Sequence, residues 1–141
     1  MRDEEIVKDW LRRAKSNLER AKAGKASKYV LYEDLCFDAQ QCAEKSVKAL
    51  LVSLNKEFPS THSIEELLGI VSDAAIAIPE EIRKAVILTR YAVHTRYPSL
   101  APTIDKDDYK EAVELAENVF KWANKIIKRG ACLLYTSDAA D

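Results

Sequence analysis

Apolar residues recur at spacings of three and four along most of the chain, and this pattern divides it into five predicted helices. The first is expected over residues 3–23 and the second over 28–54. A third is expected over 63–73 and a fourth over 79–95. The fifth is expected to begin after Asp105 and to end near residue 130.

The three longest predicted helices each carry one apolar stripe that we expect to face a common core. These stripes are Trp10, Ala14, Leu18 and Ala21, then Leu31, Leu35, Ala39, Cys42, Ser46 and Leu50, and finally Ala112, Leu115, Val119, Trp122 and Ile126. Helix starts are marked by the capping box Ser63-Ile-Glu-Glu66, by Pro79 as a first-turn proline and by Asp105 as a cap. Amphipathic helices joined by short loops predict an all-α fold, an antiparallel four- to five-helix bundle.

Composition agrees with one helical domain. The chain has 141 residues, of which 48% are hydrophobic, and it contains only 3 glycines and 4 prolines. Its net charge of -1 gives no overall attraction to nucleic acid or to a membrane, so any such surface would be a local patch. No apolar run approaches the ~20 residues of a membrane span, and the first residues do not resemble a signal peptide. We expect a cytoplasmic protein that does not bind a membrane.

The last residues differ from the rest of the chain. The segment 130–141 lacks both the helical periodicity and the charge pattern that precede it, and it resembles the translation of a transposase-type sequencing adapter. We therefore expect a single domain over residues 1–129 and a non-native tail over 130–141. A short natural tail is the alternative.

The sequence contains no pattern for a metal or a cofactor. There is no Gly-rich phosphate loop, no nucleophile elbow, and no cluster of cysteine and histidine. Outside the tail, Cys36 and Cys42 are six residues apart and do not share a helix face, so we expect buried, unpaired thiols. We expect no metal site and no cofactor.

Aromatic, cationic and imidazole side chains are concentrated at the end of the fourth predicted helix, in the segment Leu88-Thr-Arg-Tyr-Ala-Val-His-Thr-Arg-Tyr-Pro98. Because proline lacks an N–H and forces the preceding residue toward extended geometry, the helix should stop near Tyr97. The side chains of Tyr91, His94, Arg96 and Tyr97 would then lie on its last turn and exit, where they can converge on a partner.

Three separated motifs together resemble the prokaryotic HEPN domain. They are the run Leu35-Cys-Phe-Asp-Ala-Gln-Gln-Cys-Ala-Glu-Lys-Ser-Val-Lys-Ala-Leu-Leu51, the pair Thr61-His62 before a helix, and the tyrosine-rich motif that ends at Pro98. The resemblance implies a HEPN-like four- to five-helix bundle that forms a homodimer. It also implies a toxin–antitoxin pairing with a minimal nucleotidyltransferase. Some members of the family are metal-independent ribonucleases, whereas others only bind.

Ribonucleolytic HEPN domains resemble one another in an Arg-x4-6-His signature, in which a polar residue usually follows the arginine. Here three residues separate Arg90 from His94, and Tyr91 follows Arg90, so the match fails on both counts. We therefore expect an interaction module that binds a partner protein, a nucleotide or RNA. The alternative is a metal-independent RNA endonuclease toxin that uses His94 with Arg90 or Arg96 as catalytic groups.

Further candidate binding residues form a polar band on the second predicted helix. With Tyr91, Arg96 and Tyr97, the expected binding residues are Gln41, Glu44 and Lys45, and Glu44 could pair with Arg96. A solvent-exposed helix face is the alternative for the band. His62, beside the capping box, is interpreted as a structural hydrogen-bonding group.

Two further features bear on partners. The segment 12–28 contains seven basic residues and only one acidic residue, Glu19. These basic residues could either steer RNA or form an ordinary soluble surface. Isoleucine and valine side chains between 76 and 87 offer more apolar surface than one stripe needs, which agrees with the implied homodimer. These apolar residues are Ile76, Ile78, Ile82, Val86 and Ile87.

Overall fold

The structure, a computed structural model, describes residues 3–93 and 103–140, with the side chains of 93 and 131–140 left out of the description. The described residues contain helices and no strand. In chain order the elements are α1 (Asp3–Ala23), α2 (Tyr32–Ser53), α3 (Ile64–Asp73), α4 (Glu80–Arg83), the 3-10 helix η1 (Lys84–Val93) and α5 (Lys106–Ala140). The expected all-α fold is confirmed.

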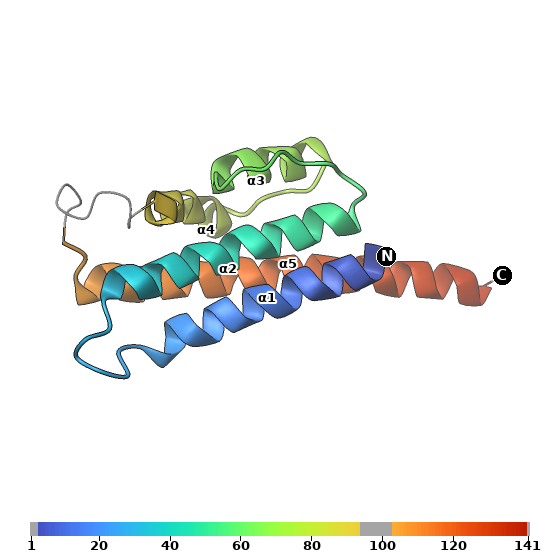
Figure 1. Cartoon of the computed structure of the whole chain (residues 1–141). Helices are drawn as coiled ribbons and strands as arrows, with labels where there is room; N and C mark the ends of the chain where they lie inside the picture. The colour runs from blue at the N-terminus through green and yellow to red at the C-terminus, as the bar shows by residue number, and fades with distance from the viewer. Residues whose placement is uncertain (1–2, 94–102, 141) are drawn as a thin grey trace.

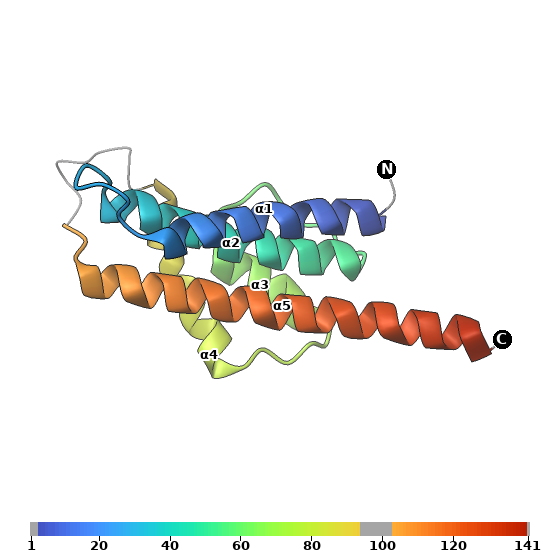
Figure 2. The ribbon, with the colours of Figure 1, turned by 90° about the horizontal axis from the view of Figure 1, so that it is seen from below.

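Three long helices form the body of the molecule (Figure 1). Helix α2 packs against both α1 and α5 and also contacts α3 and η1, so it lies at the centre of the bundle. Figures 1 and 2 show that α1 runs opposite to α2, whereas α5 runs in the same direction as α2. The short elements α3, α4 and η1 return the chain to the end of the molecule where α2 begins.

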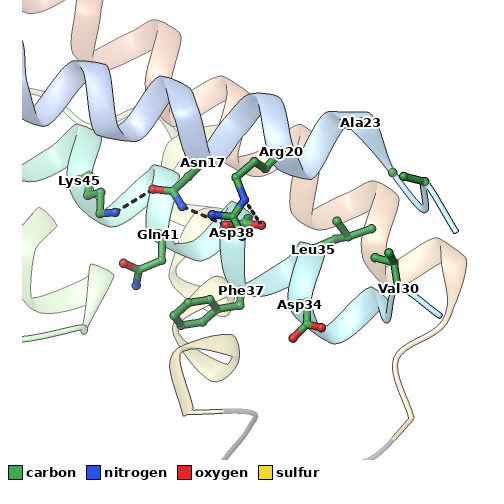
Figure 3. Close-up of a pocket in the computed structure, with 12 residues that line it drawn as sticks. Asn17, Arg20, Ala23, Val30, Asp34, Leu35, Phe37, Asp38, Gln41 and Lys45 are labelled. Carbon is green, nitrogen blue, oxygen red and sulfur yellow. Dashed lines mark hydrogen bonds and ion pairs between the residues drawn. The ribbon is translucent and has the colours of Figure 1, made fainter.

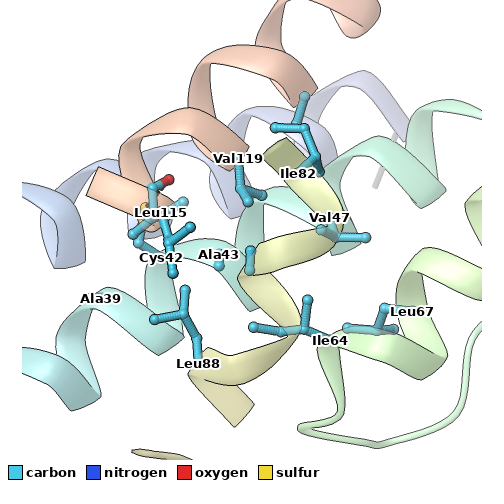
Figure 4. Packing of buried hydrophobic residues seen from close by; sticks show 14 of the residues in the cluster. Ala39, Cys42, Ala43, Val47, Ile64, Leu67, Ile82, Leu88, Leu115 and Val119 are labelled. Carbon is cyan, nitrogen blue, oxygen red and sulfur yellow. Dashed lines mark hydrogen bonds between the residues drawn. The ribbon is translucent and has the colours of Figure 1, made fainter. Parts of the chain in front are cut away.

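The core forms where the predicted stripes meet, except that Leu31, predicted in the stripe of the second helix, lies before α2 and is 54% exposed. Figure 4 shows α2 contributing Ala39, Cys42 and Val47 to a cluster with Leu115 and Val119 of α5. The small residues on α2 let its neighbours approach closely, while larger side chains from α3 and η1 close the other side. Both cysteines of α2 are free and buried, as expected.

Several helix boundaries agree with the sequence patterns. Helix α1 has the predicted bounds, and α3 begins one residue after the predicted start, because Ser63 is its N-cap: the Ser63 hydroxyl accepts a hydrogen bond from the Glu66 N–H at 3.1 Å. Helix α5 begins after Asp105, whose carboxylate accepts from the Asp108 N–H at 2.8 Å. These caps satisfy N–H groups that have no partner within the helix, and so they set where each helix starts.

Two other boundaries differ from the prediction. Helix α2 begins at Tyr32 instead of residue 28, because residues 24–31 form a separate turn-containing loop. Helix α5 continues past Gly130 to Ala140, ten residues beyond the predicted end. The first difference matters for function, because it leaves an eight-residue loop between α1 and α2.

The fourth helix is not the continuous α-helix that was predicted. Only Glu80–Arg83 are α-helical, and Lys84–Val93 form a 3-10 helix. A 3-10 helix has three residues per turn, so side chains three apart fall on one face. Ala85, Leu88 and Tyr91 have this spacing and all three are buried. The burial of one face agrees with a period of three here, and the β-branched residues of this segment have a lowered α-helix propensity.

The apolar surplus predicted between 76 and 87 is largely used inside the fold. Ile78 and Ile82 are buried, and Ile76 and Val86 are partly buried against the core. Ile87 stays 40% exposed.

Candidate functional site

The end of η1 places Arg90 against Tyr91. Tyr91 is buried, and Arg90 Nη2 donates a hydrogen bond to its hydroxyl at 2.6 Å. The guanidinium carbon also lies 4.8 Å from the centre of the Tyr91 ring, and Asp108 is 3.8 Å away from Arg90. The hydrogen bond with Tyr91 raises the pKa of Arg90, and burial raises the pKa of Tyr91. Arg90 is therefore a fixed cation, and Tyr91 supports it from the core.

The other residues predicted at this helix end lie outside the described residues. These are His94, Arg96 and Tyr97. Nearby, burial raises the pKa of the Cys36 thiol to about 12, although a hydrogen bond with Tyr91 opposes the shift. Burial likewise raises the pKa of Cys42 to about 12. Neither cysteine is a nucleophile at neutral pH, because the thiolate is the reactive form.

An open groove of about 550 Å³ runs between α1 and α2. Figure 3 shows Asn17 and Arg20 reaching it from α1, and Phe37, Asp38 and Lys45 reaching it from α2. Its lining residues are Asn17, Arg20, Ala23, Gly24, Ala26, Val30, Asp34, Leu35, Phe37, Asp38, Gln41 and Lys45. Two of the predicted binding residues, Gln41 and Lys45, therefore line one groove.

The floor of this groove is a polar network centred on Asn17. Asn17 is buried, and its amide donates to Asp38 at 3.0 Å while its carbonyl oxygen accepts from Lys45 at 2.8 Å. Arg20 lies 3.4 Å from the second oxygen of Asp38. Burial lowers the pKa of Lys45, although the Glu44 charge opposes the shift. The negative charge of Asp38 is thus paired with the positive charge of Arg20, whereas the Lys45 ammonium is hydrogen-bonded to the neutral amide of Asn17.

Glu44, the third binding residue predicted on this helix, does not line the groove. It is buried and accepts hydrogen bonds from Gln40 at 3.0 Å and Lys48 at 3.0 Å, and it lies 2.8 Å from Nδ1 of His62. Burial raises the pKa of its carboxyl, but the three hydrogen bonds outweigh this and lower the pKa overall. Lys48 extends between the rings of Trp10 and Phe58. This cluster joins α2 to the segment before α3, and the contact of His62 fits the structural interpretation.

The basic residues of the run over 12–28 contact different partners. Arg12 and Arg13 both bind Asp9, Lys15 lies near Glu19, and Lys22 pairs with Glu117 of α5. The last two basic residues of the run behave differently. Lys25 lies over the Tyr32 ring and Lys28 over the Tyr29 ring, and within the described part of the chain neither has a carboxylate partner.

Sequence reasoning missed the groove residues Asn17, Phe37 and Asp38, and it singled out Arg20 only as a member of the basic run over residues 12–28. One signal was present, because Asn17 is a polar residue beside Leu18 on the inward face of α1. A buried amide needs a hydrogen-bonding partner, and here that need brings Asp38 and Lys45 together.

The described residues provide no metal site and no membrane span. Among their side chains, no three histidine, cysteine or acidic groups lie close enough together to hold a metal ion. None of the described helices combines the length and the low charge needed to cross a bilayer.

Comparisons with known proteins agree on one family. The HEPN domain matches residues 7–126 of this chain. No curated protein matches it. Among solved structures, the archaeal HEPN homologue ST0689 is 31% identical with a TM-score of 0.69, over 86% of this chain and 97% of its own. TT1696 from Thermus thermophilus is 28% identical with a TM-score of 0.70, over 84% of this chain and 96% of its own.

A third similar structure supports the fold alone. The HEPN domain protein TM0613 from Thermotoga maritima is 23% identical with a TM-score of 0.56, over 90% of this chain and 98% of its own. The family match covers most of the chain and the structural matches cover nearly the whole of each relative, so the resemblance implied by the three sequence motifs is confirmed. The chain belongs to the HEPN domain family.

Proposed function

We propose that this HEPN domain is an interaction module that binds a nucleotide or RNA in the groove between α1 and α2. The observation that carries the proposal is the placement of Gln41 and Lys45 in one open groove beside the aromatic ring of Phe37. An amide can hydrogen-bond a base edge, an aromatic ring can contact a base face, and an ammonium can bind a phosphate oxygen. The groove therefore offers partners for the base and for the phosphate of a nucleotide.

The charges in the groove favour a nucleotide over a simple anion. Arg20 and Lys45 supply two positive charges, and Asp34 and Asp38 supply two negative charges. A groove with no net charge attracts a bare polyanion weakly, so binding has to come from specific contacts. Lys45 is the best placed of the two cations, because its hydrogen-bonding partner is the neutral Asn17.

The family resemblance also implies how the protein assembles with its partners. We infer a homodimer that works in a toxin–antitoxin-type pair with a minimal nucleotidyltransferase. The cation of Arg90, supported by Tyr91, lies at the exit of η1 and would be a second contact for the same partner.

The first test is RNA binding by the full chain in EDTA. We expect Lys45→Gln to weaken the binding of a labelled single-stranded RNA roughly tenfold, because a charge-assisted hydrogen bond to phosphate is lost. Lys125→Gln removes the same charge from an exposed site on α5 and should leave the affinity nearly unchanged. Fluorescence anisotropy measures both dissociation constants. Equal affinities for the two variants would argue against the groove as the binding site.

The same samples distinguish binding from catalysis. A binding module leaves the RNA intact after long incubation at high protein concentration, as judged on a denaturing gel. Cleavage in EDTA that disappears in His94→Ala would replace this proposal with the alternative, a metal-independent endonuclease that uses His94 with Arg90 or Arg96.

A further inference from the structure

The loop at residues 24–31, which connects α1 to α2, displays the most exposed large apolar side chains of the described residues. Tyr29 is 80% exposed and Leu31 is 54% exposed. Tyr29 and Leu31 are separated by one residue, and grouped exposed apolar side chains are a feature of interaction sites.

The loop is built to hold these side chains in place. Gly24 ends α1 with a φ of 72°, a left-handed conformation that glycine adopts without strain. The Ser27 hydroxyl accepts a hydrogen bond from the Tyr29 N–H at 3.1 Å, and the Ser27 carbonyl accepts from the Val30 N–H at 3.1 Å. At the far end, Tyr32 stacks on Tyr109 with ring centres 5.3 Å apart. Tyr29 is therefore presented by a hydrogen-bonded turn.

The loop carries positive charge and no negative charge. Its two ionisable cations are Lys25 and Lys28, and residues 24–31 contain no acidic side chain. The Lys28 ammonium lies 5.3 Å from the centre of the Tyr29 ring, and the Lys25 ammonium lies 4.4 Å from the centre of the Tyr32 ring. A cation beside an aromatic face is the combination that binds a phosphate and a neighbouring base together.

The loop is also continuous with the groove. Gly24, Ala26 and Val30 belong both to the loop and to the groove lining. The charges inside the groove cancel, so the two lysines of the loop supply the local positive charge that the groove lacks. A chain longer than one nucleotide that leaves the groove at this end would meet Lys25, Lys28 and the ring of Tyr29.

We propose that residues 24–31 form a second nucleic-acid contact, which receives a single-stranded RNA segment as it leaves the groove. Tyr29 stacks on an unpaired base, and Lys25 and Lys28 contact the flanking phosphates. Base stacking on a side chain requires a base that is free of its pairing partner, so the loop selects single strands over duplexes. This inference rests on the proposed function of the groove, and it adds the substrate class.

The test compares a short probe with a long one on the full chain. The short probe is uridine monophosphate, and the long probe is a labelled ten-nucleotide oligo(U) with 2′-O-methyl groups, which cannot be cleaved through its 2′ oxygen. We expect Tyr29→Ser to weaken binding of the long probe at least about fivefold and to leave binding of the short probe unchanged. Ile87→Ser is the matched control, because Ile87 is an exposed apolar residue on η1. Circular dichroism verifies that each variant folds.

Salt dependence tests the two lysines separately. Each phosphate contact to a single strand contributes about 0.7 to the slope of log affinity against log salt concentration, so Lys25→Gln with Lys28→Gln should reduce the slope by about 1.4. A duplex of the same length should bind more weakly than the single strand and should be insensitive to Tyr29→Ser.

The outcomes separate this inference from the proposed function. If Lys45→Gln weakens both probes while the loop variants match the wild type, the groove binds nucleotides and the loop inference is wrong. If Lys45→Gln has no effect but Tyr29→Ser and the lysine variants still weaken the long probe, the loop is the contact and the groove is not. If the loop variants change only the sedimentation mass of the protein, the loop is a protein–protein contact and the inference is overturned.

Discussion

Replacing Glu44 with alanine is expected to lower the free energy of unfolding by about 3–5 kcal/mol, because it leaves the ammonium of Lys48 buried without its counter-charge. The side chains of Glu44 and Lys48 are only 4% and 10% exposed, and their charged atoms are 3.0 Å apart. Chemical denaturation followed by circular dichroism measures the loss.

A double-mutant cycle shows whether the loss comes from the unpaired charge. Glu44→Leu combined with Lys48→Met removes both charges and fills the same space with apolar groups, so the double variant should be much more stable than either single variant. Simple addition of the two single losses would mean that each residue stabilises the fold through other contacts.

The same carboxylate gives stability a defined pH dependence. Its pKa in the folded protein lies below the ordinary value of 4.5, so the unfolded state binds a proton first as the pH falls. The stabilisation from Glu44 is therefore complete above its unfolded pKa and is lost as the pH falls through the folded pKa.

We expect the wild type to lose stability more steeply than Glu44→Gln below about pH 5. Asp9 and Glu117 also have lowered pKa values, but they contribute equally to both proteins. Parallel stability curves for the two proteins would contradict the assignment.

The second large effect is expected at Leu88 of the 3-10 helix. Leu88→Ala should lower the free energy of unfolding by about 2–5 kcal/mol, because Leu88 is fully buried and its truncation leaves a cavity in the core. The neighbouring Ile87→Ala should cost less than about 1 kcal/mol, because Ile87 points to a partly exposed face. Urea titrations of the two variants measure the difference.

This pair also tests which face of η1 is turned to the core. Positions 85, 88 and 91 are buried, as the three residues per turn of the 3-10 helix place them, whereas position 87 lies off this face. Similar losses at 87 and 88 would show that both side chains face the core, which is incompatible with the described packing.

Much of the architecture was determined locally. Helix α1 has the predicted bounds and α3 differs from them by one residue, because helix ends depend on neighbouring residues, as in the hydrogen bond from the Glu66 N–H to Ser63. The apolar stripes and the all-α class depend on the local helical period, whereas the resemblance to the HEPN family depends on the residues of three motifs. Gln41 and Lys45 were found as polar residues on one helix, and they line one groove.

Only the tertiary structure determined which partner each polar residue of α2 contacts. Glu44 contacts His62 and Lys48, whereas Lys45 contacts Asn17 of α1, although Glu44 and Lys45 are adjacent in the chain. Helical period assigns a residue to a face but does not say which distant residue covers that face. The 3-10 form of η1 was likewise not predicted, and in it Ala85, Leu88 and Tyr91 lie on one buried face. Sequence alone thus determined the all-α class and most of the inward-facing residues, whereas packing between helices determined the groove, the form of η1 and the partners of each charge.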